Sequence, residues 1–473
     1  MLRSAPLTFL FVLLLIAPRT RAQVLIGDSL MQSLTSGELM AQGVFGAQYG
    51  VQVHRLIYHT VDAHGAPTQA SGALVVPVGP PCIHPLAAYM HGTIMHREEV
   101  PSRLSSEITV GYFLGGSGYV AAMPDYLGLG DGPGPHPYVH AASEATASID
   151  MMRAAREFCA QHGVALNGQV FLAGYSQGGH ACMATHRMIE EQFAEEFTIT
   201  ASAPCSGPYD LSGVQAEVMA GPDPYPAPYY LPYVVLAYGH VYPDMYTDIA
   251  EIFKEPWATA LPPLFQGDNG AGPVNAIMPD VPSQILQDDL LAAFNNDPDH
   301  FFREALRAND LYDWTPQAPL RMVYCEADDH VFHENSLVAL AAMQANGAPQ
   351  VEAVSAGATL DHGGCALPSL LGVKAWFDGL RAPCEAIGVE EFAAGAWSLH
   401  PNPAHDRVQV IAPGMADGPL QWTLHAADGR PVAGGRAQLV QGTARVDLPV
   451  LAPGGYVWRA PASGMRGTRL MVY

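Results

Sequence analysis

The chain carries the stretch VFLAGYSQGGHACM at residues 170–183, which contains the pattern G-x-S-x-G around Ser176. The first four residues are apolar and predict a strand, and a helical pattern begins directly after the serine. A sharp strand-to-helix turn pushes the serine hydroxyl out above the sheet edge, and the flanking Gly174 and Gly178 let neighbouring backbone come close. A chance G-x-S-x-G is frequent in glycine-rich chains, so the strand before and the helix after carry the argument. They predict a nucleophile elbow with Ser176 as the nucleophile.

Apolar strand-like segments alternate with helical segments on both sides of this elbow. Strands are predicted at residues 51–60, 73–76, 86–90, 119–123, 170–173, 198–203, 320–324 and 351–354, and helices at residues 142–161, 178–191, 335–345 and 368–380. Short apolar strands that alternate with amphipathic helices are typical of a parallel sheet covered on both faces. The sequence therefore predicts an α/β fold with a doubly wound, mostly parallel sheet.

The predicted strand at residues 320–324 ends in a loop rich in carboxylates. A serine hydroxyl is a weak nucleophile and needs a general base and an orienting acid. Behind a nucleophile elbow these follow in the order serine, acid, histidine. Asp328 is the predicted acid because Val331 follows it in D-x-x-V spacing, Asp329 is the alternative, and Glu326 is a third candidate.

His362 follows the last predicted strand, in a glycine-rich loop that can fold back over the sheet edge. The chain has 19 histidines, so position after this strand is what distinguishes His362 as the predicted base. His330 and His333 are rivals, but they lie in the acid loop, before the last strand. They could be the start of a metal site, yet no third ligand is evident, so we expect no metal.

Two backbone N–H groups are candidates for an oxyanion hole. The predicted strand at residues 86–90 ends in His91-Gly92-Thr93, and a turn of this kind after an early strand supplies one donor. The residue after the nucleophile, Gln177, supplies the other. We therefore predict Thr93 and Gln177 as the oxyanion donors, with an ordinary strand-end turn as the alternative for Thr93.

The composition limits the classes of protein to which the chain can belong. Hydrophobic residues make up 49% and charged residues 14% of the 473 residues, which excludes a disordered or coiled-coil chain. The formal net charge is −23, and Lys254 and Lys374 are the only lysines. Such a chain is a poor partner for nucleic acids and anionic membranes. We expect a globular enzyme that needs no organic cofactor.

The order of segments predicts a signal peptide, a catalytic domain with an inserted cap, a linker and a C-terminal module. Residues 1–22 resemble an export signal, with Arg3 before a short apolar run and a small-residue cleavage site. Residues 23–383 are the predicted catalytic domain. Within it, residues 207–319 are rich in proline and tyrosine, and an insertion of this length between strands is typical of a cap or lid. We expect a linker at residues 384–396 and a small all-β module at residues 397–473.

The cysteine pairing stays open at this stage. Export permits disulfides, and the number of cysteines, seven, is odd. Cys182 and Cys325 lie in apolar periodic stretches and are expected to be buried thiols, whereas Cys365 and Cys384 are close enough in sequence for a local bridge.

Over residues 50–382 the chain resembles the α/β-hydrolase superfamily. Within it, MPDYLGLG at residues 123–130, HPY at residues 136–138 and SIDMMRA at residues 148–154 resemble the secretory lipase family. This resemblance implies hydrolysis of carboxylic esters, with small-molecule or lipid esters as substrates. It places Ser176, Asp328 and His362 in the catalytic triad.

The tail resembles a different family. SLHPNPA at residues 398–404, DGR at residues 428–430 and LAPGGY at residues 451–456 are similar, in this order, to the type IX secretion sorting domain. The resemblance implies a β-sandwich recognised by the outer-membrane type IX machinery, followed by surface attachment or release. A carbohydrate-binding or adhesion domain is the alternative.

Other functions on the same fold stay open. A prolyl-type serine peptidase shares the triad, but usually adds a large separate domain and an acidic pair for the substrate amine, neither of which is evident. An acyltransferase would use the same acyl-enzyme with an alcohol acceptor. A non-catalytic surface binding module would normally have lost one of the three catalytic residues.

Overall fold

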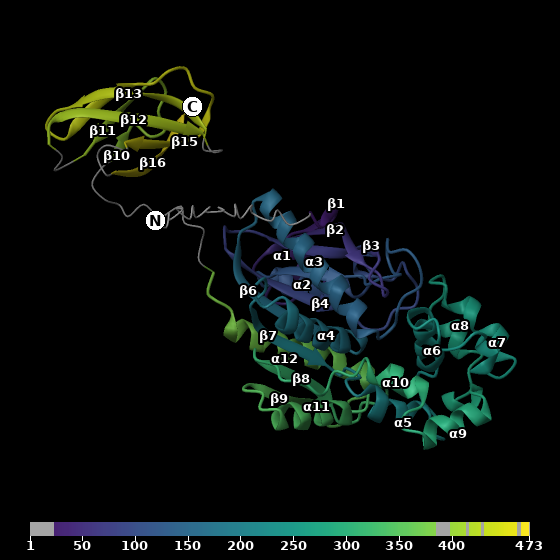
Figure 1. Ribbon diagram of the computed structural model, residues 1–473. Helices are drawn as coiled ribbons and strands as arrows, with labels where there is room; N and C mark the ends of the chain where they lie inside the picture. The colour runs from purple at the N-terminus through teal and green to yellow at the C-terminus, as the bar shows by residue number, and fades with distance from the viewer. Residues whose placement is uncertain (1–22, 385–397, 413–415, 427–429, 461–464, 473) are drawn as a thin grey trace, which may run out of the picture. The chain divides into compact units, whose positions relative to one another are not determined.

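The computed structural model describes residues 23–384, 398–412, 416–426, 430–460 and 465–472, side chains excepted at 465–469. The chain forms two compact units that divide after Cys384 (Figure 1). The predicted signal peptide, residues 1–22, and the predicted linker after Cys384 lie outside the described residues. None of the helices in the described ranges has the length and apolarity that a membrane crossing requires.

The larger unit is built on a nine-stranded sheet with the order β1-β2-β3-β5-β4-β6-β7-β8-β9. The strands are β1 (Leu25–Leu34), β2 (Gly50–Val61), β3 (Pro67–Val78), β4 (His84–Met90), β5 (Val120–Pro124), β6 (Leu166–Tyr175), β7 (Ile199–Cys205), β8 (Leu320–Cys325) and β9 (Val351–Gly357). The pairs β1–β2, β2–β3 and β3–β5 are antiparallel. The pairs β5–β4, β4–β6, β6–β7, β7–β8 and β8–β9 are parallel. The predicted mostly parallel α/β sheet is confirmed.

Six helices cover the two faces of this sheet. They are α1 (Ser36–Ala41), α2 (Ile108–Gly116), α3 (Ala141–His162), α4 (Gln177–Gln192), α11 (Glu334–Ala345) and α12 (His362–Leu380). Helices α3, α4 and α11 pack on one face, and α1, α2 and α12 pack on the other. Along β4, Leu86 and Ala88 face the first layer and Ala87 and Tyr89 the second, as the alternation of a strand requires. The turn predicted as the nucleophile elbow, between β6 and α4, thus rests on a core that is apolar on both sides.

A long segment between β7 and β8 forms its own apolar cluster. Its helices are α5 (Ala216–Met219), α6 (Tyr230–Val241), α7 (Trp257–Ala260), α8 (Ala271–Asn275), α9 (Asp288–Asn296) and α10 (Phe301–Arg307). Short turns of 3₁₀ or π type lie in the same segment at Leu211–Gln215, Ile249–Glu251, Pro262–Phe265 and Pro282–Ile285. One more such turn, Pro101–Arg103, precedes α2. Figure 1 shows α5–α10 gathered at one side of the sheet, and Tyr138 and Val139, just before α3, pack into their cluster.

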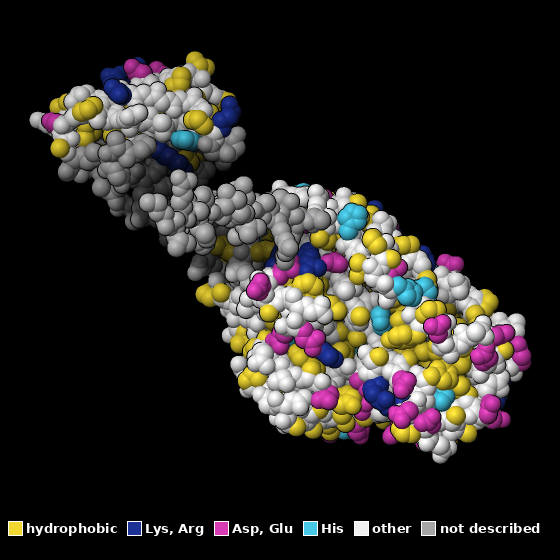
Figure 2. Space-filling model, viewed as in Figure 1, with side chains coloured by type: hydrophobic (Ala, Val, Ile, Leu, Met, Phe, Trp, Pro, Cys, Tyr) yellow, Lys and Arg dark blue, Asp and Glu magenta, His cyan; other side chains and the backbone are white. Residues whose placement is uncertain are grey.

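The surface of the larger unit carries scattered acidic side chains with few basic ones between them. Figure 2 shows this over the visible face, with hydrophobic side chains exposed among the charges of the α5–α10 region. The pattern agrees with a net charge of −23. A surface of this sign repels anions at long range.

The smaller unit is all-β. One sheet contains β10 (Ser398–His400), β11 (Arg407–Ile411) and β14 (Thr443–Asp447), and the other contains β12 (Gly418–Ala426), β13 (Pro431–Leu439), β15 (Gly454–Ala460) and β16 (Met465–Val472). Every strand pair in the two sheets is antiparallel. Both sheets contribute to a shared apolar core, in which Trp422 and Trp458 stack with ring centroids 4.5 Å apart.

The disulfides correct the expectations drawn from sequence. Cys325 is bonded to Cys365, and Cys82 is bonded to Cys384, across separations of 40 and 302 residues. Cys325 is therefore not a free thiol, and Cys365 does not pair with its nearer neighbour Cys384. The tertiary fold brings the end of β8 against α12, and nearness in sequence says nothing about this contact. Three cysteines are unpaired and buried: Cys159, Cys182 and Cys205.

Candidate active site

Ser176 stands at a strained turn between β6 and α4. Its backbone has φ 61° and ψ −123°, in the left-handed half of conformational space that few non-glycine residues adopt. The turn is held by neighbouring backbone, since the Ser176 N–H donates to the carbonyl of Cys205 at 2.9 Å. A Cβ at Gly174 would lie 1.9 Å from the Gly178 carbonyl oxygen, and a Cβ at Gly178 would lie 1.9 Å from that of Met90. The elbow therefore requires glycine at both positions.

Replacing Gly178 with alanine is expected to destabilise the larger unit by about 3 kcal/mol or more, because the new methyl group meets rigid backbone. For a unit of this size the thermal midpoint should fall by roughly 4 °C or more. The matched control is Gly372→Ala in α12, where an added Cβ meets no atom within 4 Å. This control should be neutral or stabilising by about 0.5–1 kcal/mol. Thermal unfolding followed by circular dichroism compares the two, and equal midpoints would contradict the close approach at Gly178.

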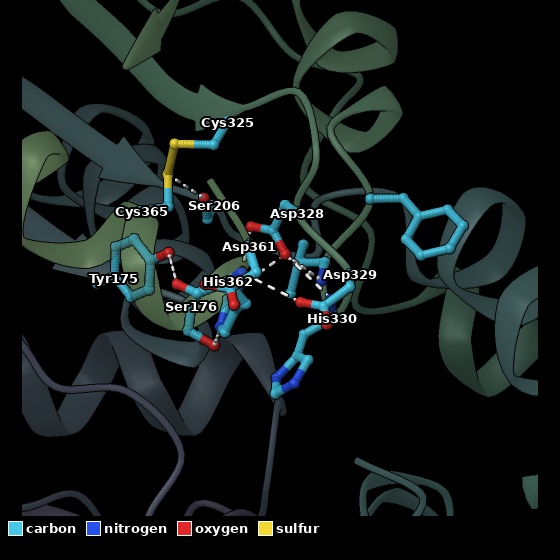
Figure 3. Close-up of polar contacts among 12 residues, drawn as sticks. Tyr175, Ser176, Ser206, Cys325, Asp328, Asp329, His330, Asp361, His362 and Cys365 are labelled. Carbon is cyan, nitrogen blue, oxygen red and sulfur yellow. Dashed lines mark hydrogen bonds and ion pairs between the residues drawn. A yellow bond between two sulfur atoms is a disulfide. The ribbon is translucent and has the colours of Figure 1, made fainter. Parts of the chain in front are cut away.

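Three side chains form a hydrogen-bonded chain at the carboxyl ends of the parallel strands (Figure 3). His362 Nε2 lies 2.9 Å from Ser176 Oγ, and His362 Nδ1 lies 2.9 Å from both carboxylate oxygens of Asp328. The exposed fractions are only 6% for Ser176, 5% for Asp328 and 7% for His362. With Nδ1–H donating to the carboxylate, Nε2 is free to accept the hydroxyl proton.

The two neighbouring aspartates occupy different places. The Asp328 carboxylate contacts the imidazole ring and also accepts from the backbone N–H groups of His330 and Val331. Asp329 is exposed, and among the described residues its carboxylate accepts only the backbone N–H of His362, at 3.1 Å. The structure thus brings Asp328, not Asp329, to the ring.

His362 is the first residue of α12 rather than part of a free loop. Asp361 caps this helix and accepts the backbone N–H of Gly364 at 2.7 Å. The sequence predicts this helix only from residue 368, whereas it begins six residues earlier and holds Pro368 in its interior. Tyr175 donates its hydroxyl to the His362 carbonyl at 2.5 Å, which ties the helix start to the elbow.

The rival histidines lie nearby but do not contact Ser176. The ring of His330 stacks on that of His362 with centroids 4.7 Å apart, and burial together with the neighbouring His362 lowers the pKa of His330. His333 stacks on Tyr324 at the far side of the acid loop. Within the described residues, no group of three or more His, Cys, Asp or Glu side chains is arranged to hold a metal ion.

The two predicted oxyanion donors flank the elbow. Gln177 is the first residue of α4, where backbone N–H groups have no partner inside the helix. Thr93 follows Gly92, and a Cβ at Gly92 would lie 3.7 Å from Ser176 Cβ, so this turn packs against the nucleophile. Neither N–H donates a hydrogen bond to another group in the described parts of the chain. Thr93 Oγ1 shares a hydrogen bond with the Tyr138 hydroxyl at 2.9 Å.

A buried polar cluster behind the elbow was not predicted from sequence. Gln177 Nε2 donates to Glu144 Oε1 and to His136 Nε2, both at 2.8 Å. The second oxygen of Glu144 lies 2.7 Å from His180 Nδ1, and His180 Nε2 lies 2.9 Å from the carbonyl of Asn309. The available signal was a carboxylate within the apolar face of a predicted helix, which requires a buried partner. The cluster fixes the first turn of α4.

Acid destabilisation is expected from His136. Burial lowers the pKa of its imidazole to about 4, and the Leu127 carbonyl that Nδ1 contacts at 2.8 Å offsets only part of this effect. Since the unfolded value is about 6.5, the unfolded chain binds more protons between pH 6.5 and 4. Stability should therefore rise with pH across this window, with about 3 kcal/mol from this group.

The variant His136→Gln tests this assignment through the pH dependence rather than through stability at one pH. Its free energy of unfolding in urea should vary less between pH 4 and 7 than that of the wild type. The exposed His59, replaced by glutamine, is the matched control and should keep the wild-type slope. Parallel curves for His136→Gln and wild type would contradict the assignment.

An apolar pocket opens beside Ser176 and Gln177. Side chains of α6, α9 and α10 line it, among them Leu231, Val234, Val235, Leu290, Phe294, Phe301, Phe302 and Leu306. Its lining offers mainly aliphatic and aromatic surface, as is typical of small-molecule sites. The arrangement suits a nucleophilic serine acting on a group attached to an extended apolar chain.

Comparisons with known proteins agree with this geometry. The model of the secretory lipase family matches residues 104–356. A ligand-bound form of the rice cell wall degrading esterase LipA from Xanthomonas oryzae is 32% identical, with a TM-score of 0.69, and the match covers 76% of this chain and 100% of that chain. A putative hydrolase from Legionella pneumophila is 28% identical, with a TM-score of 0.70, and the match covers 77% and 100%.

Candida antarctica lipase A shares the fold at 17% identity, with a TM-score of 0.59, over 76% of this chain and 84% of that one. No curated protein matches the chain.

Proposed function

Since this chain belongs to the secretory lipase family and is a carboxylic ester hydrolase, we propose that it cleaves esters of extended apolar acyl groups through an acyl-enzyme on Ser176. The observation that carries the proposal is the hydrogen-bonded chain from Asp328 through His362 to Ser176, together with the apolar cavity that Ser176 lines. Residues 23–383 are then the catalytic domain.

Acylation begins when Ser176 Oγ attacks the ester carbonyl and His362 Nε2 takes the hydroxyl proton. Asp328 holds the imidazole tautomer and stabilises the imidazolium that forms. The backbone N–H groups of Gln177 and Thr93 stabilise the oxyanion. His362 then donates its proton to the departing alcohol as the ester bond breaks. A water molecule repeats the sequence on the acyl-enzyme and releases the acid.

The inserted segment, residues 207–319, acts in this proposal as a cap that supplies the acyl site. Its residues contribute most of the apolar cavity lining, and Tyr138, which precedes α3, lines the same cavity. Each methylene group transferred from water into such a site gains about 0.8 kcal/mol. The acyl chain, rather than the alcohol, therefore determines most of the substrate preference.

The test is a series of p-nitrophenyl esters with acyl chains from two to sixteen carbons. The value of kcat/KM should rise about three- to fourfold per methylene group until the cavity is filled. Leu290→Trp in the cavity wall should move the optimum to shorter chains, and Leu367→Trp on the exposed face of α12 should leave it unchanged. A flat profile that Leu290→Trp does not alter would contradict the acyl site. Cleavage of proline-linked amides but not esters would indicate a peptidase instead.

We also propose that the chain is exported and that residues 397–473 form a sorting domain for the type IX machinery. The support is the order of motifs in the tail, together with its compact all-β unit. In a bacterium with this machinery, the full chain should reach the surface or medium without residues 1–22. A chain that stops at Cys384 should stay in the periplasm. Equal export of both would contradict the sorting role and favour an adhesion or carbohydrate-binding module.

A further inference from the structure

One disulfide brackets the acid and the base of the proposed triad. Cys325 is the last residue of β8 and precedes Asp328 by three residues, and Cys365 follows His362 by three residues in the first turns of α12. Figure 3 shows the sulfur–sulfur bond beside the contact between Asp328 and His362. The bond therefore joins the two backbone segments that must stay together for the acid to hold the base.

The segment between β7 and β8 also holds the acid loop, since Gln215 Nε2 and the Tyr225 hydroxyl donate to the His330 carbonyl at 3.1 and 2.7 Å, but this contact does not join the loop to α12. The ladder between β8 and β9 becomes irregular between Tyr324 and Cys325, so Asp328 lies beyond the regular sheet. The Glu326 N–H still donates to the carbonyl of Gly357, at 3.1 Å. Between the described residues of the loop and α12, two noncovalent contacts accompany the contact of Asp328 with His362. The His362 N–H donates to exposed Asp329, and the His330 ring stacks on that of His362. The covalent bond is thus the strongest restraint on the separation of the two segments.

The disulfide is also buried in a fixed environment. Cys325 and Cys365 are both fully buried. Cys365 Sγ lies 3.4 Å from Ser369 Oγ and 3.8 Å from Ser206 Oγ, the latter on the turn that follows β7. The Cys365 sulfur is bonded to Cys325 and contacts both serines, so it cannot shift without moving the first turn of α12. Because His362 lies in this same turn, the disulfide helps to set the position of His362.

We propose that the Cys325–Cys365 disulfide positions Asp328 against His362, so that its loss lowers the catalytic rate without loss of substrate binding. The proposal rests on the proposed function of the triad. A dithiol reductant would break the bond by supplying two electrons and two protons. Two cysteine thiols form, and the dithiol becomes a cyclic disulfide. The loop and the helix are then free to separate.

The second disulfide is a matched control in the same chain. Cys82 lies just before β4, at the amino ends of the parallel strands, whereas the triad lies at their carboxyl ends. Its partner, Cys384, follows α12 at the far end from His362. Loss of this bond removes a covalent link of similar kind but leaves the Asp328 contact untouched. Stability should change in both cases, and the catalytic rate in only one.

The experiment compares the full chain carrying Cys325→Ala/Cys365→Ala with the full chain carrying Cys82→Ala/Cys384→Ala. Initial rates on one p-nitrophenyl ester are measured well below both unfolding temperatures. The first variant should lose ten- to a hundredfold in kcat with KM within about twofold of wild type, because a misplacement near 1 Å has effects of this order. The second should keep kcat within about twofold. An unchanged kcat in the first variant would overturn the proposal.

Two further measurements separate positioning from folding. In an Asp328→Asn background, loss of the Cys325–Cys365 bond should cause no further fall in kcat, because the bond acts through Asp328. An independent fall would mean that the bond has a different role.

If the Cys325/Cys365 variant does not fold, the Cys82→Ala/Cys384→Ala protein is titrated with dithiothreitol instead. Activity should fall as thiols appear, return on reoxidation, and leave the circular dichroism spectrum unchanged. Loss of the folded spectrum together with activity would show a merely structural bond.

These outcomes are distinct from a failure of the proposed function. If the wild type itself hydrolyses no ester and no fluorophosphonate labels Ser176, the triad assignment fails before the disulfide is considered. If the wild type is active and the Cys325/Cys365 variant keeps its kcat, only the disulfide proposal fails.

Discussion

Ser176→Ala is expected to lower kcat for ester hydrolysis by about 10⁶-fold, the size of effect seen when a serine hydrolase loses its nucleophile. The reason is geometric, because Ser176 Oγ is the hydroxyl that lies within 2.9 Å of His362 Nε2. The oxyanion donors and the apolar cavity remain, so a residual rate of about 10³–10⁴ over water should persist. Alanine adopts the left-handed turn no less readily than serine, so the fold should be retained.

The measurement combines rate and labelling. Wild type should react stoichiometrically with a fluorophosphonate, and Ser176→Ala should not react at all. Ser106→Ala, at an exposed position before α2, is the matched control and should keep the wild-type rate. Thermal midpoints within a few degrees of each other would show that the loss is chemical. A Ser176→Ala protein that still hydrolyses esters at more than a hundredth of the wild-type rate would place the nucleophile elsewhere.

The elbow could be predicted because its rule is local. A strand, a glycine, a serine and a helix follow one another within fourteen residues, and the clashes that require Gly174 and Gly178 come from backbone that this turn always brings close. The core strands were predicted for a similar reason, since a strand buried on both faces is apolar throughout. Strand β1 was missed because it is an edge strand with a mixed burial pattern, so its sequence does not alternate clearly.

Features that depend on distant partners could not be predicted. The pairing of Cys325 with Cys365 follows from the meeting of β8 with α12. The contact between Glu144 and His180 spans 36 residues and joins two helices. No fixed separation in sequence predicts either contact, because only tertiary packing brings the two partners together. The start of α12 was misplaced for another reason, since Pro368 is tolerated within the helix and local preference is overridden by the fold.

The sequence left Asp329 open as an alternative to Asp328 for the triad acid. Because only Asp328 of the two contacts the His362 ring, substitution of each aspartate tests the choice. Asp328→Asn is expected to lower kcat by about 10⁴-fold. An asparagine can turn its amide N–H towards His362 Nδ1, which stabilises the tautomer with a proton on Nε2. That nitrogen can no longer accept the Ser176 proton. The KM for the ester should change little, because Asp328 contacts the imidazole and backbone N–H groups rather than the cavity.

Asp329→Asn is the matched control one residue away. Its amide oxygen can still accept the His362 backbone N–H, so the start of α12 keeps its contact and kcat should stay within about threefold of wild type. The two variants remove the same charge from the same loop, and a general electrostatic effect of that charge would therefore reduce both rates alike. Only direct contact with Nδ1 separates them by orders of magnitude. If instead Asp329→Asn is the inactive variant, the loop must rearrange when substrate binds, and the acid in the working enzyme is Asp329.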